Sequence, residues 1–163
     1  MKQLLTWTKG LFDSNYQIYN NSQIRASLHF SSWKNNARGI ALHKNYYFTT
    51  EGFFNPVTKI RDENFQDIGV ITYHSWQLKA TITFTNLEHA SWGYTNGWLS
   101  QWSISNHREK QIQYRSSTAS GTILSNNEDE LLLLSGVFIR EYFSRIMILI
   151  LIIIFLPALI RGF

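Results

Sequence analysis

The last 37 residues of the chain, from Asn127 to Phe163, hold the feature that most constrains its fold. They form a long apolar tract, LLLLSGVFIREYFSRIMILILIIIFLPALI, that is interrupted near its middle by Arg140, Glu141 and Arg145. A charged side chain at the centre of a bilayer costs about 2.5 to 3.5 kcal/mol on insertion scales, so three of them disfavour one membrane span over residues 131–160. The tract is better interpreted as two apolar elements.

The second element, residues 146–163, is predicted to be a hydrophobic helical tail that anchors the chain in a membrane. Its fifteen most apolar residues, 146–160, would extend about 22 Å as a helix, against a hydrocarbon core of about 30 Å. Extending the span to Phe143 and Phe163, with Arg145 and Arg161 snorkelling to the two interfaces, would bring it to about 30 Å. The residues chosen to represent this membrane segment are Ile146, Ile150, Ile154, Phe155 and Ile160.

The first element, residues 128–145, is predicted to be a helix buried by protein, because a helix that is apolar on all sides must be covered. Ser125 or Asn126 is expected to cap it, and the acidic residues 128–130 complement its positive end. A closed β-barrel could enclose such a helix and would leave no sheet edge exposed. The residues chosen to represent this central helix are Leu131, Leu134, Val137 and Phe138.

Before residue 126 the sequence has the character of short antiparallel strands. In QIRASLHF, the apolar residues Ile24, Ala26, Leu28 and Phe30 alternate with polar ones, which predicts one buried face. Hairpins are expected to turn at Lys44-Asn45, around residues 75–77 and at Asn96-Gly97, the last as a two-residue type I′ turn. About ten to twelve strands precede the helix, so the predicted class is mainly β, with a barrel domain over residues 1–145.

This order of elements resembles the tubby C-terminal-like superfamily, which includes the LURP-one-related proteins and the phospholipid scramblases. The resemblance lies in the many short strands, the acidic turn NNEDE and the apolar sequence LLLLSGVFIREYF that follows it. It implies a closed antiparallel barrel of roughly twelve strands around a central hydrophobic helix near the C-terminus. It implies no functional residue, because no counterpart of the family's phosphoinositide-binding or calcium-binding positions is present.

The residues that commonly carry chemistry do not form a known catalytic or cofactor pattern. The chain has no cysteine, and its five histidines lack zinc-site spacing. His29 and His74 stand beside serines on predicted strands, which leaves a hydrolase as a lesser alternative, although no nucleophile elbow is found. No Gly-rich phosphate loop is present. We therefore expect no enzyme, no cofactor and no metal.

The aromatic cluster Trp92, Tyr94, Trp98 and Trp102 has three interpretations. Packing inside the barrel is the simplest, stacking on bases or sugars is a second, and an aromatic belt at a membrane interface is a third. The belt agrees with the apolar tail, so these four residues are retained as candidate interface aromatics. The net charge of +4 is spread thinly, and nucleic acid is not an expected partner.

Together these patterns predict a non-enzymatic, membrane-anchored barrel that serves as an interaction or accessory module, for example as a subunit of a membrane complex. The expected partners are a membrane, an anionic phospholipid and other membrane-complex subunits. A protein that binds or handles phospholipid is the alternative. The anchor is expected at the C-terminus with the barrel on the cytoplasmic side, because basic residues precede the apolar tail.

Overall fold

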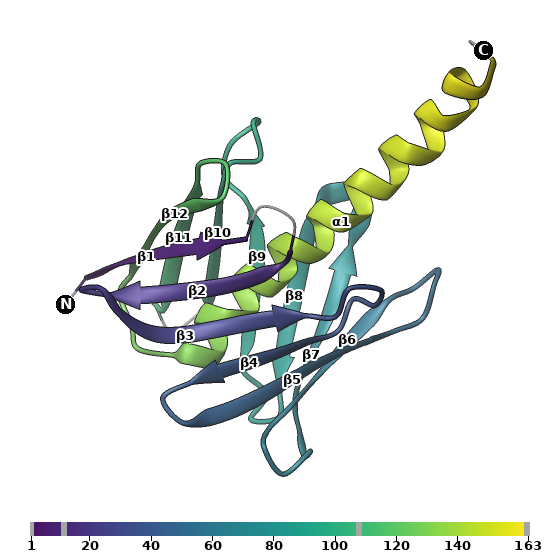
Figure 1. Cartoon of the computed structure of the whole chain (residues 1–163). Coiled ribbons are helices and arrows are strands. Elements are labelled where there is room, and N and C mark those ends of the chain that lie inside the picture. The colour runs from purple at the N-terminus through teal and green to yellow at the C-terminus, as the bar shows by residue number, and fades with distance from the viewer. Residues whose placement is uncertain (1, 11–12, 107–108, 162–163) are drawn as a thin grey trace.

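The computed structural model describes residues 2–10, 13–106 and 109–161, apart from the side chain of residue 159, and it shows a closed antiparallel β-barrel (Figure 1). The strands within these residues are β1 (Gln3–Lys9), β2 (Asn15–Asn20), β3 (Gln23–Phe30), β4 (Ala37–Ala41), β5 (Lys44–Glu51), β6 (Val57–Arg61), β7 (Asp67–His74), β8 (Lys79–Phe84), β9 (His89–Tyr94), β10 (Gln101–Asn106), β11 (Gln111–Ser116) and β12 (Ser120–Ser125). A 3₁₀ turn, η1 (Ser75–Gln77), joins β7 to β8. The predicted mainly β class and closed barrel are confirmed.

The strands follow one another around the barrel in chain order, and β1 pairs with β12 to close it. Because each strand is antiparallel to the next, successive connections alternate between the two ends of the barrel. We call one end the entry end: it holds the β2–β3, β4–β5, β6–β7, β8–β9 and β10–β11 connections and the link from β12 to the helix. The other end, the exit end, holds the β1–β2, β3–β4, β5–β6, β7–β8, β9–β10 and β11–β12 connections.

One continuous helix, α1 (Glu130–Arg161), follows β12, enters the barrel and projects from the exit end (Figure 1). Its residues from Leu132 to Ile139 and from Glu141 to Phe143 are buried, whereas its side chains are exposed from Ile148 onward. The two predicted elements are therefore two halves of one helix in two environments. The charges near position 140 mark where it leaves the barrel, not a break between helices.

The start of α1 differs from the prediction. The backbone N–H of Leu132 donates to the Asp129 carboxylate at 2.9 Å, so Asp129 caps the helix in place of Ser125 or Asn126. Ser125 instead closes β12, where its hydroxyl donates to the carbonyl of Asn127 at 2.7 Å. Asp is both a preferred capping residue and a favourable charge at the positive end of a helix. The sequence therefore does not distinguish the capping Asp129 from its acidic neighbours.

Strand β3 also departs from simple alternation. Ala26, Leu28 and Phe30 face the core as predicted, but Ile24 is 61% exposed. Ile18 pairs with Ala26 and Tyr19 with Ile24, so Arg25 is an extra residue that forms a β-bulge against β2. A bulge breaks the alternation, so the residues on its two sides no longer follow one pattern of inward and outward faces, and Ile24, which precedes Arg25, lies outside the barrel.

Two predicted turns lie elsewhere. The β4–β5 turn is at Leu42 and His43, which both have positive φ, and not at Lys44-Asn45, which begin β5. Asn96-Gly97 lies within a longer loop between β9 and β10, where the Asn96 side-chain oxygen accepts the backbone N–H groups of Ser100 and Gln101. That side-chain bonding builds the loop without a two-residue type I′ turn.

The predicted transmembrane anchor is not supported. Over the part of the chain that the structure describes, no helix is sufficiently long and apolar to pass through a membrane. The extension of the span toward Phe143 also fails, because Phe143 is 1% exposed and packs inside the barrel. Phe163, at the other end of the predicted span, lies outside the described residues.

Candidate functional site

The barrel interior is occupied by α1, which is held there by hydrogen bonds from three large side chains. The indole N–H groups of Trp92 and Trp102 both donate to the carbonyl of Gly136, at 3.0 and 3.1 Å. The hydroxyl of Tyr114 donates to the carbonyl of Leu133 at 2.9 Å. Because burial disfavours the phenolate, it raises the pKa of the Tyr114 hydroxyl. The predicted central residues Leu134, Val137 and Phe138 are buried in this core, and Leu131 is partly buried at its edge.

The structure divides the predicted aromatic cluster. Trp92 and Trp102 are 2% and 1% exposed, so they belong to the core and cannot form a surface interface. Tyr94 is partly buried and packs against Trp92, with ring centroids 5.0 Å apart. Trp98, in the β9–β10 loop, is 91% exposed. Of the four candidates, only Trp98 is a largely exposed aromatic side chain.

A buried ionic cluster lies where α1 leaves the barrel. The carboxylate of Glu141 is 3% exposed and accepts hydrogen bonds from Tyr16 at 2.5 Å, Ser14 at 2.6 Å and Lys9 at 3.0 Å. Arg145, one turn further along α1, donates to the same carboxylate at 3.3 Å. Glu141 thus ties the helix to β1, β2 and the loop between them.

Glu141 is held in its charged form by these partners. Burial alone opposes ionisation, but the hydrogen bonds from Ser14 and Tyr16 and the ammonium of Lys9 outweigh it and lower the pKa of Glu141 to about 2. Burial and the neighbouring Glu141 charge raise the pKa of the Tyr16 hydroxyl, which therefore stays protonated and donates. The cluster is a fixed ionic latch between helix and barrel.

Arg145 fixes the exit point of α1 from another side. Its guanidinium donates to the carbonyls of Ser31 and Lys34 in the β3–β4 loop, at 3.0 and 3.2 Å, and lies 4.7 Å from the centre of the Phe30 ring. Arg145 is thus bonded to the barrel at the base of the exposed part of α1, and the predicted snorkelling of its side chain to a membrane interface stays a prediction. The free part of α1 begins immediately after it.

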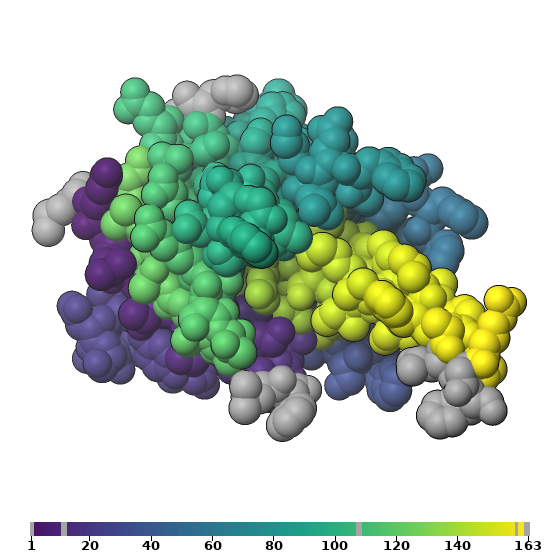
Figure 2. Space-filling view, turned by 90° about the horizontal axis from the view of Figure 1, so that it is seen from above, coloured from purple at the N-terminus to yellow at the C-terminus, as the bar shows by residue number. Residues whose placement is uncertain are grey.

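Residues 146–161 form what we call the projecting half of α1 (Figures 1 and 2). Ile146 and Met147 still touch the core, but the described large apolar side chains that follow, at 148–156 and 160, are each about half exposed or more, from 49% at Ile150 to 69% at Ile160. Ile154 and Phe155 are 61% and 58% exposed. This exposure continues over consecutive positions, so every face of the projecting half is uncovered as well as apolar.

A hollow of about 500 Å³ lies between the base of the projecting half and the β1–β2 and β3–β4 loops. Its polar lining includes the cations Lys9 and Arg145, the hydroxyl of Ser14 and the carboxylates Asp13 and Glu141, and its apolar lining includes Ile148 and Leu149 of the helix and Trp33. Hydrogen-bond donors therefore stand beside apolar surface within one concavity.

Within the described part of the chain, neither His29 nor His74, the two histidines considered for hydrolysis, bonds a carboxylate. His29 contacts Ser27 Oγ and Asn15 Oδ1, at 3.2 and 3.3 Å, on the exposed outer face of the barrel. His74 is exposed at the end of β7. Within the described ranges, no group of three or more histidine, aspartate or glutamate side chains could hold a metal ion.

Sequence reasoning missed two features of the exit end. Three partners of Glu141, namely Lys9, Ser14 and Tyr16, come from β1, β2 and their connecting loop, more than 120 residues away, and no local sequence pattern predicts them. Trp33 and Trp76 lie in connections, where alternation gives no signal, yet they are 97% and 102% exposed. Only the alternation of connections between the two barrel ends brings both to the end from which α1 leaves the barrel.

No protein-family model matches this chain, and comparisons with curated proteins and with solved structures also found no match. The resemblance to the tubby C-terminal-like superfamily therefore stays a prediction.

Proposed function

We propose that the protein is a non-enzymatic module held at a membrane by the projecting half of α1, which enters the apolar layer from one side, while the barrel acts as an interaction or accessory module for other subunits of a membrane complex. The observation that carries this proposal is a helix that is both apolar and exposed on every face. Burial of apolar surface contributes roughly 25 cal/mol per Å², so a projecting apolar helix is strongly driven out of water.

The uniform exposure favours lipid over a groove on one partner protein. A helix that docks in a groove presents one apolar face and keeps polar residues on the other. Residues 146–160 contain no charged residue and, apart from Ala158 and Pro157, only large apolar side chains. Such a segment must be covered on all sides, and lipid does this without a second specific surface.

Vesicle flotation tests the proposal. The double variant Ile150→Glu, Ile154→Glu places two carboxylates on the projecting half, and a charge in the apolar layer costs about 2.5 to 3.5 kcal/mol. We expect at least a roughly hundredfold loss of partitioning into phosphatidylcholine vesicles.

Two controls accompany this variant. Leu42→Glu with Leu87→Glu adds the same charge to exposed positions at the entry end, and Ile150→Leu with Ile154→Leu keeps the tail apolar. Both should bind vesicles as the unaltered protein does. Equal flotation of the charged-tail variant and the unaltered protein would overturn the proposal.

Removing the end of the projecting half should leave the barrel stable. A chain that ends at Met147 keeps Glu141, Arg145 and every buried part of α1, and the residues removed are largely exposed. We expect its thermal midpoint to change by no more than a few degrees and its solubility without detergent to rise. Aggregation of this shortened chain would contradict the division of α1 into a structural half and a membrane half.

The hollow at the exit end favours phospholipid binding as a second candidate function. Lys9 and Arg145 are bonded to Glu141 but have further N–H donors that could bind a phosphate, and Ile148 and Leu149 could contact the start of an acyl chain. The charged-tail variant keeps this hollow, so saturable binding of dihexanoyl phosphatidylserine to that variant, measured by calorimetry, would support lipid handling. If no saturable binding is found, lipid handling is ruled out and the membrane-anchored module is the one remaining proposed function.

The side of the membrane on which the barrel lies follows from the same proposal. We place the barrel on the cytoplasmic side, because anionic lipid is concentrated in that leaflet and Arg145 and Lys34 stand at the base of the projecting half.

A further inference from the structure

The exposed tryptophans of the barrel all lie at one end. Trp33 is in the β3–β4 loop, Trp76 in η1 between β7 and β8, and Trp98 in the β9–β10 loop, and each is more than 90% exposed. Phe53 and Phe54, in the β5–β6 loop, are 88% and 91% exposed. All four connections belong to the exit end. We call these five residues the exit rim.

The other tryptophans of the chain show that this exposure is selective. Trp7, Trp92 and Trp102 are at most 2% exposed and fill the barrel. An exposed Trp gains nothing from the fold, whereas its amphipathic ring has a strong preference for the headgroup level of a bilayer. The connections of the entry end carry exposed apolar side chains too, but these are Leu42, Phe65 and Leu87, without tryptophan.

Charge separates the two ends in the same sense. Eight of the eleven acidic residues lie at the entry end, namely Asp62, Glu63, Asp67, Glu88, Glu109, Glu128, Asp129 and Glu130. The described basic residues of the entry end are Lys2, Arg25, Lys44, Arg61 and Lys110, so acidic residues outnumber basic ones there. The exit end has the basic residues Lys9, Lys34, Lys79, Arg115, Arg140 and Arg145 against three acidic ones, of which Asp13 and Glu51 are exposed and Glu141 is buried and paired. An anionic membrane surface would therefore attract the exit end and repel the entry end.

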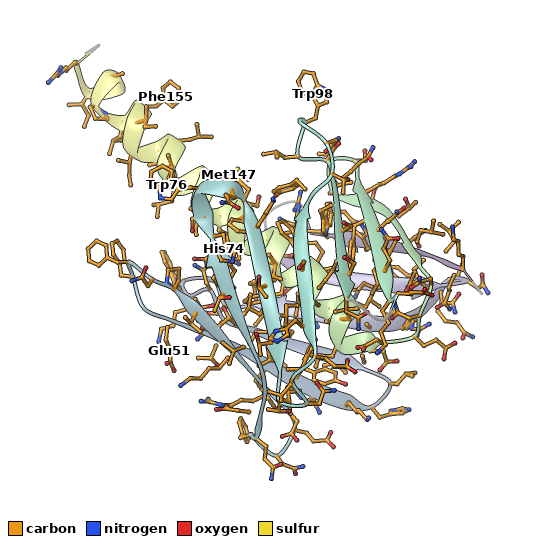
Figure 3. All side chains as sticks on the ribbon, turned by 180° about the vertical axis from the view of Figure 1, so that it is seen from behind. Glu51, His74, Trp76, Trp98, Met147 and Phe155 are labelled. Carbon is orange, nitrogen blue, oxygen red and sulfur yellow. The ribbon has the colours of Figure 1, made fainter. Side chains whose placement is uncertain are left out.

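The exit rim and the projecting half of α1 point the same way (Figure 3). In this view Trp76 is drawn near Met147, and Trp98 stands at the tip of its loop at the end from which the helix leaves the barrel. The ionic latch at Glu141 fixes the helix relative to the barrel at this point. Insertion of the helix would bring the rim against the membrane surface without a change in the fold.

We infer that the exit rim is a second membrane contact, which sits in the headgroup layer of an anionic phospholipid bilayer and holds the barrel with its axis directed into the membrane. This inference rests on the proposed function, because the projecting half brings the rim to the lipid. The rim then sets orientation and depth, while the helix supplies most of the attachment. The entry end, with its acidic connections, faces the aqueous side and stays open to partners.

The test uses the full chain and vesicles of phosphatidylcholine with 30% phosphatidylserine. The rim variant Trp33→Ser, Trp76→Ser, Trp98→Ser removes three rings that make almost no contact within the fold, so stability should be unchanged. We expect partitioning to fall by about tenfold or more. The matched control, Leu4→Ser, Leu42→Ser, Leu87→Ser, removes three exposed apolar side chains from the entry end and should partition as the unaltered protein does.

Fluorescence quenching gives a second measurement that does not depend on affinity. The fluorescence of each rim tryptophan is obtained as the difference between the unaltered protein and Trp33→Ser, Trp76→Ser or Trp98→Ser. When vesicles are present, each of these rings should be protected from quenching by aqueous acrylamide. Nitroxide lipids labelled near the headgroup should quench them, whereas Trp7, Trp92 and Trp102 should be unaffected by either quencher.

The outcomes separate this inference from the proposed function. If the charged-tail variant loses vesicle binding but the rim variant does not, and the rim tryptophans stay open to acrylamide on vesicles, the anchor stands and the rim inference is overturned. If the unaltered protein fails to bind vesicles, both fall. Equal loss of partitioning in the rim variant and in the entry-end control would also overturn the inference, because the effect would then be general apolarity.

Discussion

Replacing Gly136 with alanine is expected to lower the free energy of unfolding by about 3 kcal/mol, although the same change in the middle of a helix ordinarily stabilises it by about 1 kcal/mol. The added Cβ would stand 2.2 Å from the hydroxyl oxygen of Tyr114. Tyr114 cannot move aside, because its hydroxyl is bonded to Leu133 and its ring is stacked on Trp102 at a centroid distance of 5.2 Å. A shift of the helix would instead weaken the two indole hydrogen bonds to Gly136.

Thermal and denaturant unfolding, followed by near-ultraviolet circular dichroism, measure this effect. Gly97→Ala is the matched control, since an added Cβ there meets no atom within 4 Å and should be neutral. In the double variant Gly136→Ala, Tyr114→Leu the clash is relieved, so its destabilisation should be smaller than the sum of the two single changes. An unchanged or raised thermal midpoint for Gly136→Ala would show that α1 is not closely fitted to the barrel.

The general plan of the fold could be predicted because it depends on patterns that the chain repeats. Alternation such as Ala26, Leu28 and Phe30 identifies strands one at a time, and an apolar helix after many strands needs a closed sheet to cover it. The local errors have local causes. The bulge at Arg25 has no signal in the alternating pattern, yet Ile24 lies outside the barrel because of it. The side chain of Asn96 forms hydrogen bonds that shape the β9–β10 loop, which the Asn-Gly pair alone does not predict.

The candidate site was much harder to predict, since it depends on which residues meet in space. The charges at Arg140, Glu141 and Arg145 were recognised as a boundary, but the sequence does not show that Lys9, Ser14 and Tyr16 complete it. The rim tryptophans are likewise far apart in the chain and follow no period. They become one surface only once the barrel has placed alternate connections at the same end.

The ionic latch explains how one helix can serve two environments. The buried half of α1 packs at a fixed position among the core aromatics. Under the proposed function, the projecting half would be surrounded by lipid. Arg145 and Glu141 lie between the two halves and hold α1 to β1, β2 and the β3–β4 loop. These contacts join the base of the projecting half to the barrel wall at the exit end.

Replacing Glu141 with glutamine is expected to destabilise the protein by about 3 to 5 kcal/mol at neutral pH, because it leaves Lys9 and Arg145 partly buried without their common counter-charge. Asp67→Asn is the control, since the Arg61–Asp67 ion pair is exposed and should contribute no more than about 1 kcal/mol. Denaturant unfolding at pH 7 measures both. If the loss of stability at Glu141 is as small as that at Asp67, the ionic latch contributes little to the stability of the fold.

The pH dependence of stability gives the sharper result. The pKa of Glu141 is lowered from its ordinary value of 4.5 to about 2 in the folded chain, a difference of about 3 kcal/mol, so its charge stabilises the fold above pH 4.5. As the pH falls from 4.5 toward 2, the unfolded chain takes up the proton first and this contribution is lost. The glutamine variant has no such proton to bind, so its stability should fall less over that interval and approach that of the unaltered protein near pH 2. Parallel curves for the two proteins between pH 7 and pH 2 would contradict the assignment of Glu141 as the charged centre of the latch.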